Sequence, residues 1–68
     1  MFGATYTIRD AASQEVLAAG IDTRDETIRR AKASAVARRL PCHIERIGPT
    51  GKAIRLAEVD AAGHFRAV

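Results

Sequence analysis

The sequence predicts an α+β domain of the order hairpin, helix, hairpin (ββαββ), and three local signals support this prediction. Residues 23–26 have the pattern of a capping box, in which the Thr23 hydroxyl accepts from the Glu26 N–H and the Glu26 carboxylate reaches back to the Thr23 N–H. Pro41 disfavours helical geometry at Leu40, so the helix should end there. The stretch 48–51, Gly-Pro-Thr-Gly, is typical of a hairpin turn.

Alternation of side chains locates the strands. In residues 5–10, Tyr6 and Ile8 fall on one face and threonines and an arginine on the other, as expected for a half-buried strand. The remaining turns and strands are expected at residues 11–14 (turn), 15–21 (strand), 42–47 (strand), 53–59 (strand), 60–63 (turn) and 64–68 (a short fifth strand or a loose end).

The length of the helix constrains the order of the strands. A helix of about 16 residues rises about 24 Å, enough to return the chain along the sheet, so the third strand runs parallel to the second. If the first strand lies between them, every neighbouring pair is antiparallel. We therefore expect one domain over residues 1–68, with a four-stranded antiparallel sheet in the order 2-1-3-4 and the helix on one face.

This order places the second strand at an edge of the sheet. Its residues Val16, Leu17, Ala18 and Ala19 include no charge and no proline, the devices that normally prevent pairing with another chain. We therefore regard Val16, Leu17 and Ala18 as candidate contacts for a partner strand.

The helix has two apolar stripes. At about 100° per residue, Ile28, Ala31 and Ala35 form one stripe, and we assign it to the core because small residues allow close approach to the sheet. The residues on the nearly opposite stripe, with Val36 between the two, are Ala33, Ala37 and Leu40. This second stripe is either ordinary exposed apolar surface or a contact for another subunit.

The composition favours association with a second chain. A domain of 68 residues buries only roughly 60% of the surface that its unfolded form exposes. Alanine is the commonest of its apolar residues, its aromatics are Phe2, Tyr6 and Phe65, and the lone Cys42 excludes an intrachain disulfide. A homodimer or another protein partner would add buried area.

The expected location is the cytoplasm. The first residues lack the pattern of a signal peptide, and no apolar run is long enough for a membrane span. Arginine outnumbers lysine nine to two, which we ascribe to a GC-rich, bacterial genome.

The net charge of +3 is located on the helix segment, where residues 22–40 include six basic and three acidic side chains. Nucleic-acid phosphates are a candidate ligand for such a surface. The candidate contacts are Arg29, Arg30, Lys32, Arg38 and Arg39.

Helix stability explains much of the same pattern. Acidic residues lie at the N-terminus and basic ones at the C-terminus, as the helix dipole favours, while Asp25 with Arg29 and Glu26 with Arg30 have the spacing of ion pairs. The sequence also lacks closely spaced aromatics that would stack on unpaired bases.

A phosphate-binding loop is excluded by two positions. The sequence Gly48 to Lys52 matches the end of the pattern G-x-x-x-x-G-K-[ST], but Arg46 stands where the first glycine is needed and Ala53 where the hydroxyl is needed. No helix follows to hold a phosphate at its N-terminus. A hairpin turn explains these residues.

The sequence offers no catalytic or metal site. Cys42 and His43 are neighbours on one strand and point to opposite faces, so they cannot act as a nucleophile and base pair. We expect Cys42 in the core and His43 on the surface, and these two with His64 match no zinc pattern. The acidic residues outside the helix segment are scattered, with no reason to converge in a pocket; they are Asp10, Glu15, Glu45, Glu58 and Asp60.

Two resemblances add to this picture. The helix, with Asp22, Thr23, Glu26, Thr27, Ile28, Ala31 and Ala35, resembles that of a group of short bacterial proteins of unknown function, in which it has the form D-T-x-x-E-A-I-x-x-A-x-x-x-A between two hairpins. This sequence departs from the group at two positions. Thr27 replaces the usual alanine of the helix, and the aromatic residue expected in the second strand is absent, with Leu17 as the nearest bulky residue. The helix is also similar to that of HicB-type antitoxin N-terminal domains, which implies an antitoxin role by analogy of fold alone.

The sequence therefore predicts a non-enzymatic accessory or protein-interaction module that self-associates, with no cofactor and no small-molecule substrate. The alternative is a nucleic-acid-binding domain that uses the basic helix. A subunit that completes an enzyme or toxin complex is a third hypothesis.

Overall fold

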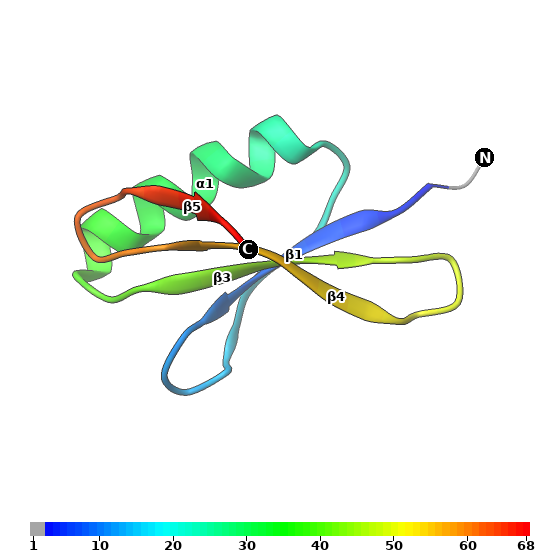
Figure 1. Ribbon diagram of the computed structural model, residues 1–68, viewed down its shortest axis with the longest axis horizontal. Coiled ribbons are helices and arrows are strands. Elements are labelled where there is room, and N and C mark those ends of the chain that lie inside the picture. The colour runs from blue at the N-terminus through cyan, green and yellow to red at the C-terminus, as the bar shows by residue number, and fades with distance from the viewer. Residues whose placement is uncertain (1–2) are drawn as a thin grey trace.

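Five antiparallel strands form one sheet in the order β2-β1-β3-β4-β5, and one helix covers one face of it (Figure 1). This computed structural model describes residues 3–68, so Met1 and Phe2 lie outside the described residues. The elements are β1 (Thr5–Asp10), β2 (Val16–Ile21), α1 (Arg24–Arg38), β3 (Cys42–Ile47), β4 (Ala53–Val59) and β5 (Phe65–Ala67). The predicted order 2-1-3-4 is confirmed, and the fifth strand pairs with β4.

The core lies between α1 and the sheet. The pairing of β1 with β3 continues through both strands without a shift and places Ile8 opposite Ile44, both 1% exposed. The helix contributes Ala31 and Ala35, which are buried as predicted, and their small side chains let the helix approach the strands closely. Ile28 is half-buried and packs against this cluster.

The helix also buries Thr27, which the stripe of apolar residues does not include. Its side chain has no exposed surface, and its Oγ1 donates to the Thr23 carbonyl oxygen at 2.7 Å. That bond satisfies the hydroxyl within the helix, so a threonine can occupy a core position at little cost. The sequence analysis did not place Thr27 in the core, because the polarity of a threonine does not reveal that its hydroxyl can bond to a carbonyl one helical turn earlier.

The two helix ends differ from the prediction in one detail each. Thr23 Oγ1 accepts from the Glu26 N–H at 3.2 Å, as predicted, but the Glu26 carboxylate binds two arginines rather than the Thr23 N–H. The helix ends at Arg38, because Arg39 adopts the left-handed conformation at φ 57° and the Leu40 N–H donates to the Ala35 carbonyl.

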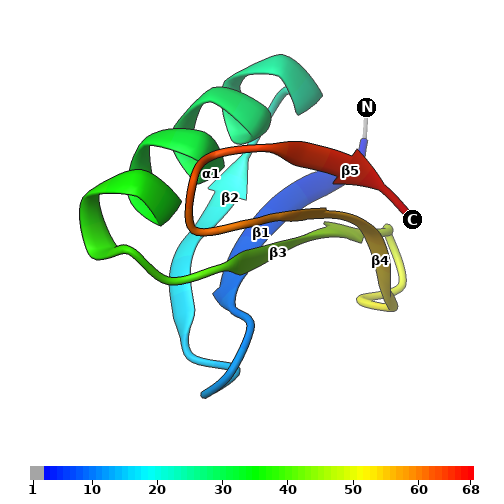
Figure 2. The same ribbon diagram turned by 60° about the vertical axis from the view of Figure 1, so that its left-hand side comes forward.

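The second hairpin curls around the helix. A register shift in the β3–β4 pairing bends β4, and the turn to β5 then passes beside α1 (Figure 2). Gly63 in this turn has φ +89°, and a Cβ there would lie 2.9 Å from Val36 Cγ2. Phe65 packs against the core, with the Arg24 guanidinium 5.9 Å from its ring centroid. This wrapping adds buried surface to a small core.

The other face of the sheet is polar. Arg9 Nε donates to Glu45 Oε1 at 2.9 Å, and Glu58 binds both Arg55 and Arg66. The Arg9–Glu45 and Glu58–Arg66 pairs join neighbouring strands, while Arg55 and Glu58 lie on the same strand. Thr7 on this face is only 6% exposed although no helix covers it.

Candidate interaction surface and cavity

An exposed apolar stripe follows the outer side of α1. We define the outer helix stripe as Ala33, Val36, Ala37 and Leu40. Ala31 and Ala35 face the core, so Ala33, Ala37 and Leu40 on the other side of the helix receive no cover from the sheet. Val36 lies between the two sides, with its Cγ2 close to Gly63 of the β4–β5 turn. Val36 is 53% and Leu40 43% exposed. The predicted second stripe is therefore uncovered in the single chain.

Charges of opposite sign stand at the two ends of this stripe. Asp25 and Glu26 occupy the first helical turn, Arg38 the last turn, and Arg39 the C-cap. The Arg29 side chain, followed by that of Arg30, holds the pKa of Glu26 below its usual range by donating to its carboxylate. That carboxylate therefore stays ionised at neutral pH.

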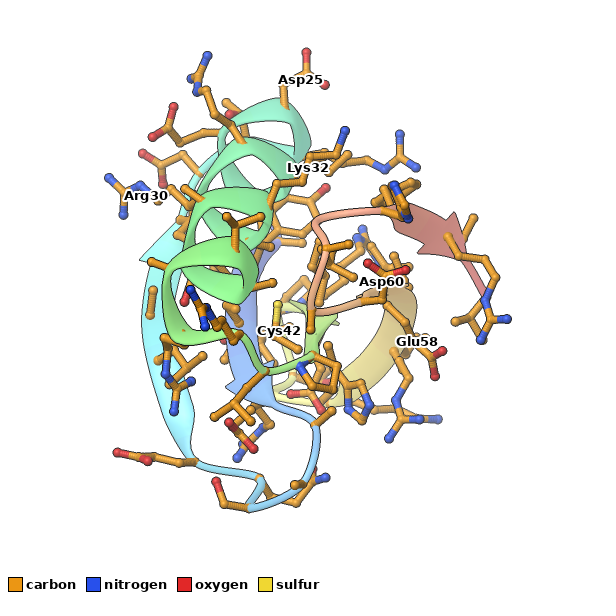
Figure 3. All side chains as sticks on the ribbon, turned by 90° about the vertical axis from the view of Figure 1, so that its left-hand side faces the viewer. Asp25, Arg30, Lys32, Cys42, Glu58 and Asp60 are labelled. Atoms are coloured by element: carbon orange, nitrogen blue, oxygen red, sulfur yellow. The ribbon has the colours of Figure 1, made fainter. Side chains whose placement is uncertain are left out.

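The basic side chains of the helix do not converge on one surface. Arg30 and Lys32 point to opposite sides of α1 (Figure 3). Arg29 and Arg30 both bind Glu26, so the predicted Asp25–Arg29 pair is wrong and the Glu26–Arg30 pair is confirmed. Among the described residues, Lys32 and Arg39 form no ion pair.

The β2 edge is exposed but irregular. Val16 is 46% exposed, whereas Leu17 and Ala18 are half-buried and pack against the core. The pairing of β2 with β1 shifts register twice, and Gly20 has φ +69°. Such bulges twist an edge away from regular pairing, so this edge has a protective device that its composition did not indicate.

A cavity of about 420 Å³ opens between the start of β3 and the β4–β5 hairpin. We call it the hairpin cavity. Its apolar lining includes Pro41, Val59 and Phe65. Its polar lining consists of His43, Glu58, Asp60, His64 and Arg66. The expectation that the carboxylates outside the helix are scattered is therefore wrong for Glu58 and Asp60, which both line this cavity. Figure 3 shows the two side chains near each other at the end of β4.

Both carboxylates of the hairpin cavity have partners in the protein. Asp60 Oδ1 accepts from the backbone N–H groups of His64 and Ala62 at 2.9 Å, and Oδ2 lies 3.2 Å from His64 Nδ1. Glu58 Oε1 accepts from Arg66 Nη2 at 2.6 Å. These donors, the His64 N–H for Asp60 and Arg66 for Glu58, hold both pKa values below the usual range. Both groups are therefore ionised at neutral pH.

His43, by contrast, is buried without a partner. The prediction of a surface position is wrong, because the side chain is only 7% exposed. Its cross-strand neighbours are Arg9 and Glu58, whose long side chains cover it. Its Nδ1 atom is buried and has no hydrogen-bond partner in the structure. A buried polar atom without a hydrogen bond costs about 1–3 kcal/mol.

Cys42 lies on the opposite face from His43, as predicted. It is 2% exposed, and its Sγ donates to the Ala31 carbonyl oxygen at 3.6 Å. Burial raises the pKa of its thiol, which keeps the group protonated and unreactive. This cysteine is a core residue.

Two further features of the described residues bear on function. Residues 3–68 contain no group of three or more histidine, cysteine or acidic side chains arranged to hold a metal ion. Within the same residues, no helix has the length and apolar character needed to cross a membrane. The chain matches no protein-family model, no curated protein and no solved structure.

Proposed function

We propose that this protein is a non-enzymatic, cytoplasmic interaction module that self-associates through the outer helix stripe. The main support is the stripe itself, because four neighbouring apolar residues stay exposed on a helix whose other side is fully used by the core. Ala33 and Ala37 are small, so a second helix can pack closely on them. Burying Val36 and Leu40 would contribute more area than the alanines.

The charges at the helix ends favour a second copy of this chain as the partner. When two such helices pack antiparallel around a two-fold axis near Ala33, Asp25 in the first turn of one lies near Arg39 at the C-cap of the other, while Glu26 and Arg38 keep their partners within the chain. The helix dipoles then also oppose each other favourably. A single exposed stripe buries less than a standard interface, so we expect a weak dimer that forms with rising concentration.

The β2 edge is the less favoured site for the same partner. Its two register shifts interrupt the regular row of N–H and C=O groups that strand addition requires. Leu17 and Ala18 already contact the core of their own chain, so they have little area left for a partner. Single substitutions on the helix and on the β2 edge can show which of the two surfaces forms the interface.

Light scattering coupled to size exclusion, from about 10 µM to 1 mM in protein, tests the proposal. We expect the mass of the native chain to rise towards that of a dimer, and Ala33→Glu to keep it monomeric at least tenfold higher in concentration. Ala53→Glu is the matched control, because Ala53 is exposed at the start of β4. A native chain that stays monomeric would contradict self-association.

A second substitution distinguishes the two surfaces. Val16→Lys places a charge at the β2 edge without touching the helix. If it abolishes the dimer while Ala33→Glu does not, the edge is the interface and our choice of surface is wrong.

Nucleic-acid binding by Arg29, Arg30, Lys32, Arg38 and Arg39 is the competing proposal. The ion pairs with Glu26 and Asp10 neutralise part of this set. Titration with duplex DNA and RNA at 50 and 200 mM salt tests it, since phosphate contacts weaken steeply with salt. Submillimolar binding that weakens with salt and is lost in a Lys32→Gln/Arg39→Gln variant would favour it over self-association.

A further inference from the structure

We propose that the end of the β3–β4 hairpin is an arm that enters the major groove of double-stranded DNA and binds its phosphates. We define the β3–β4 arm as residues 46–55, the turn of this hairpin with the strand residues beside it. Figure 1 shows the arm extending past the start of α1, on the side of the molecule away from the helix C-terminus. The helix therefore gives it no cover, and residues 49–55 are all exposed.

The charge of the arm is positive and unbalanced. Residues 46–57 contain no acidic side chain, and their basic side chains are Arg46, Lys52 and Arg55. Within the described part of the chain, Arg46 and Lys52 form no ion pair, and Arg55 contacts Glu58 at 3.7 Å. The preceding residue, Glu45, is already held in an ion pair on the sheet. The positive charge of the arm is therefore open to an anionic partner.

The basic side chains of the arm face in two directions. In the pairing of β3 with β4, Arg46 lies opposite Ile54, and Glu45 lies opposite Arg55. Because successive residues of a strand point to opposite faces, Arg46 and Arg55 stand on opposite faces of the two-stranded ribbon. Lys52 directly follows the turn. A ribbon with this arrangement can contact anionic groups on both of its sides at once.

The tip between these side chains is narrow and held by backbone hydrogen bonds. Its residues have short side chains and are Gly48, Pro49, Thr50 and Gly51. The Gly48 N–H donates to the Lys52 carbonyl at 3.0 Å, and the Gly51 N–H donates to the Gly48 carbonyl at 2.9 Å. The major groove of B-DNA is about 12 Å wide and admits a two-stranded β-ribbon. Its two phosphate walls offer anions to both faces of the arm, which an acidic peptide or a flat membrane surface does not.

Fluorescence anisotropy with a labelled DNA duplex of about 20 base pairs, two helical turns, tests this inference on the full chain. With three phosphate contacts, we expect binding to weaken roughly 40-fold between 50 and 200 mM salt, since each contact adds about 0.9 to the logarithmic salt slope. An RNA duplex of the same length should bind more weakly, because its major groove is narrow and deep. Absence of DNA binding at 50 mM salt, or equal or tighter binding of RNA, would overturn the proposal.

Two double variants with the same loss of charge locate the contacts. Arg46→Gln/Lys52→Gln removes two contacts from the arm, so DNA binding at 50 mM salt should weaken at least about tenfold, and the further loss at 200 mM should fall to roughly fourfold. Lys32→Gln/Arg39→Gln removes the same charge from the helix and its C-cap, and should weaken binding by less than about threefold.

All four substituted side chains are exposed, so both variants are expected to fold, and circular dichroism checks this. Equal losses in the two variants would show that DNA responds only to the net charge of the protein. A larger loss in the helix variant would place the contacts on α1. Either result would overturn the assignment of DNA binding to the arm.

Discussion

Arg38, in the last turn of α1, places its Nη1 3.2 Å from Oδ2 of Asp10 at the end of β1. The Asp10 side chain is 4% exposed, and its Oδ1 accepts from the N–H groups of Ala12 and Ser13 at 2.8 Å. One carboxylate therefore shapes the β1–β2 turn and joins it to the C-terminus of the helix. The N–H of Ser13, more than any other group, holds the pKa of Asp10 below its ordinary value of 3.8.

Stability should fall in acid partly through this residue. A carboxyl group whose pKa is lowered on folding contributes stability above its unfolded value of 3.8, and that stability is lost as the pH falls through the lowered value. We expect Asp10→Asn to be less stable than the native chain at pH 7. The difference should shrink steadily below about pH 4.

Urea unfolding from pH 7 to pH 2 measures this difference. Glu26, Glu58 and Asp60 also have lowered pKa values, so the comparison with Asp10→Asn isolates one group from a common background. A gap between the two proteins that does not change with pH would show that the charge of Asp10 has no role.

Replacing Thr27 by valine should destabilise the fold despite its burial in an apolar core. The change keeps the shape and removes the bond from Oγ1 to the Thr23 carbonyl. We expect a loss of about 1 kcal/mol in the free energy of unfolding, measured by urea titration. Thr50→Val, at an exposed turn, is the control and should change stability by less than about 0.5 kcal/mol. If Thr27→Val is instead more stable than the native chain, the bond from the hydroxyl to the Thr23 carbonyl does not stabilise the fold.

Two glycines with similar backbones should respond differently to alanine. Gly51 and Gly63 have φ +85° and +89°, but a Cβ at Gly51 meets open space, while one at Gly63 would lie 2.9 Å from Val36 Cγ2. We expect about 1–2 kcal/mol of destabilisation for Gly51→Ala from backbone strain alone. For Gly63→Ala we expect about 1–3 kcal/mol more, because the helix must move.

A double-mutant cycle measures the contact. Val36→Ala removes the methyl group, so the combination with Gly63→Ala should recover most of the extra loss. Additive effects of the two substitutions in thermal unfolding would show that the hairpin moves away from α1 at no cost.

The N-cap should stabilise the helix through Thr23 alone. Since the Glu26 side chain binds Arg29 and Arg30, the bond from the Glu26 N–H to Thr23 Oγ1 is the part of the capping box that forms. Thr23→Ala should therefore cost about 1 kcal/mol, and Thr23→Ser should restore most of it. Far-ultraviolet circular dichroism during denaturation gives the comparison. If Thr23→Ala is as stable as the native chain, the helix begins at this residue because of packing and not because of the cap.

Local signals were enough to predict the elements and their order. The N-cap and the Gly48–Gly51 turn are arrangements within four residues, and each formed where the pattern indicated. The strands β1, β3 and β4 begin and end at the predicted residues because alternation depends on the strand itself. The outer helix stripe follows from helix periodicity in the same way. Its role as an interface remains a proposal.

The burial of His43, the Asp10–Arg38 ion pair and the hairpin cavity were not predictable, because each joins residues that are distant in the chain. Whether a strand residue is covered depends on its cross-strand neighbours, and Arg9 and Glu58 reach His43 only after the sheet has assembled. The bulges in β2 arise from pairing and not from composition.

The sequence by itself determined where the helix and the strands β1, β3 and β4 begin, which helix face enters the core and which apolar stripe is left outside, since hydrogen bonds and periodicity act within a few residues. Only the tertiary structure decided which charges are neutralised, which edge is protected and which polar groups share a cavity. Those properties depend on side chains that the twist of the sheet and the curl of the last hairpin bring together.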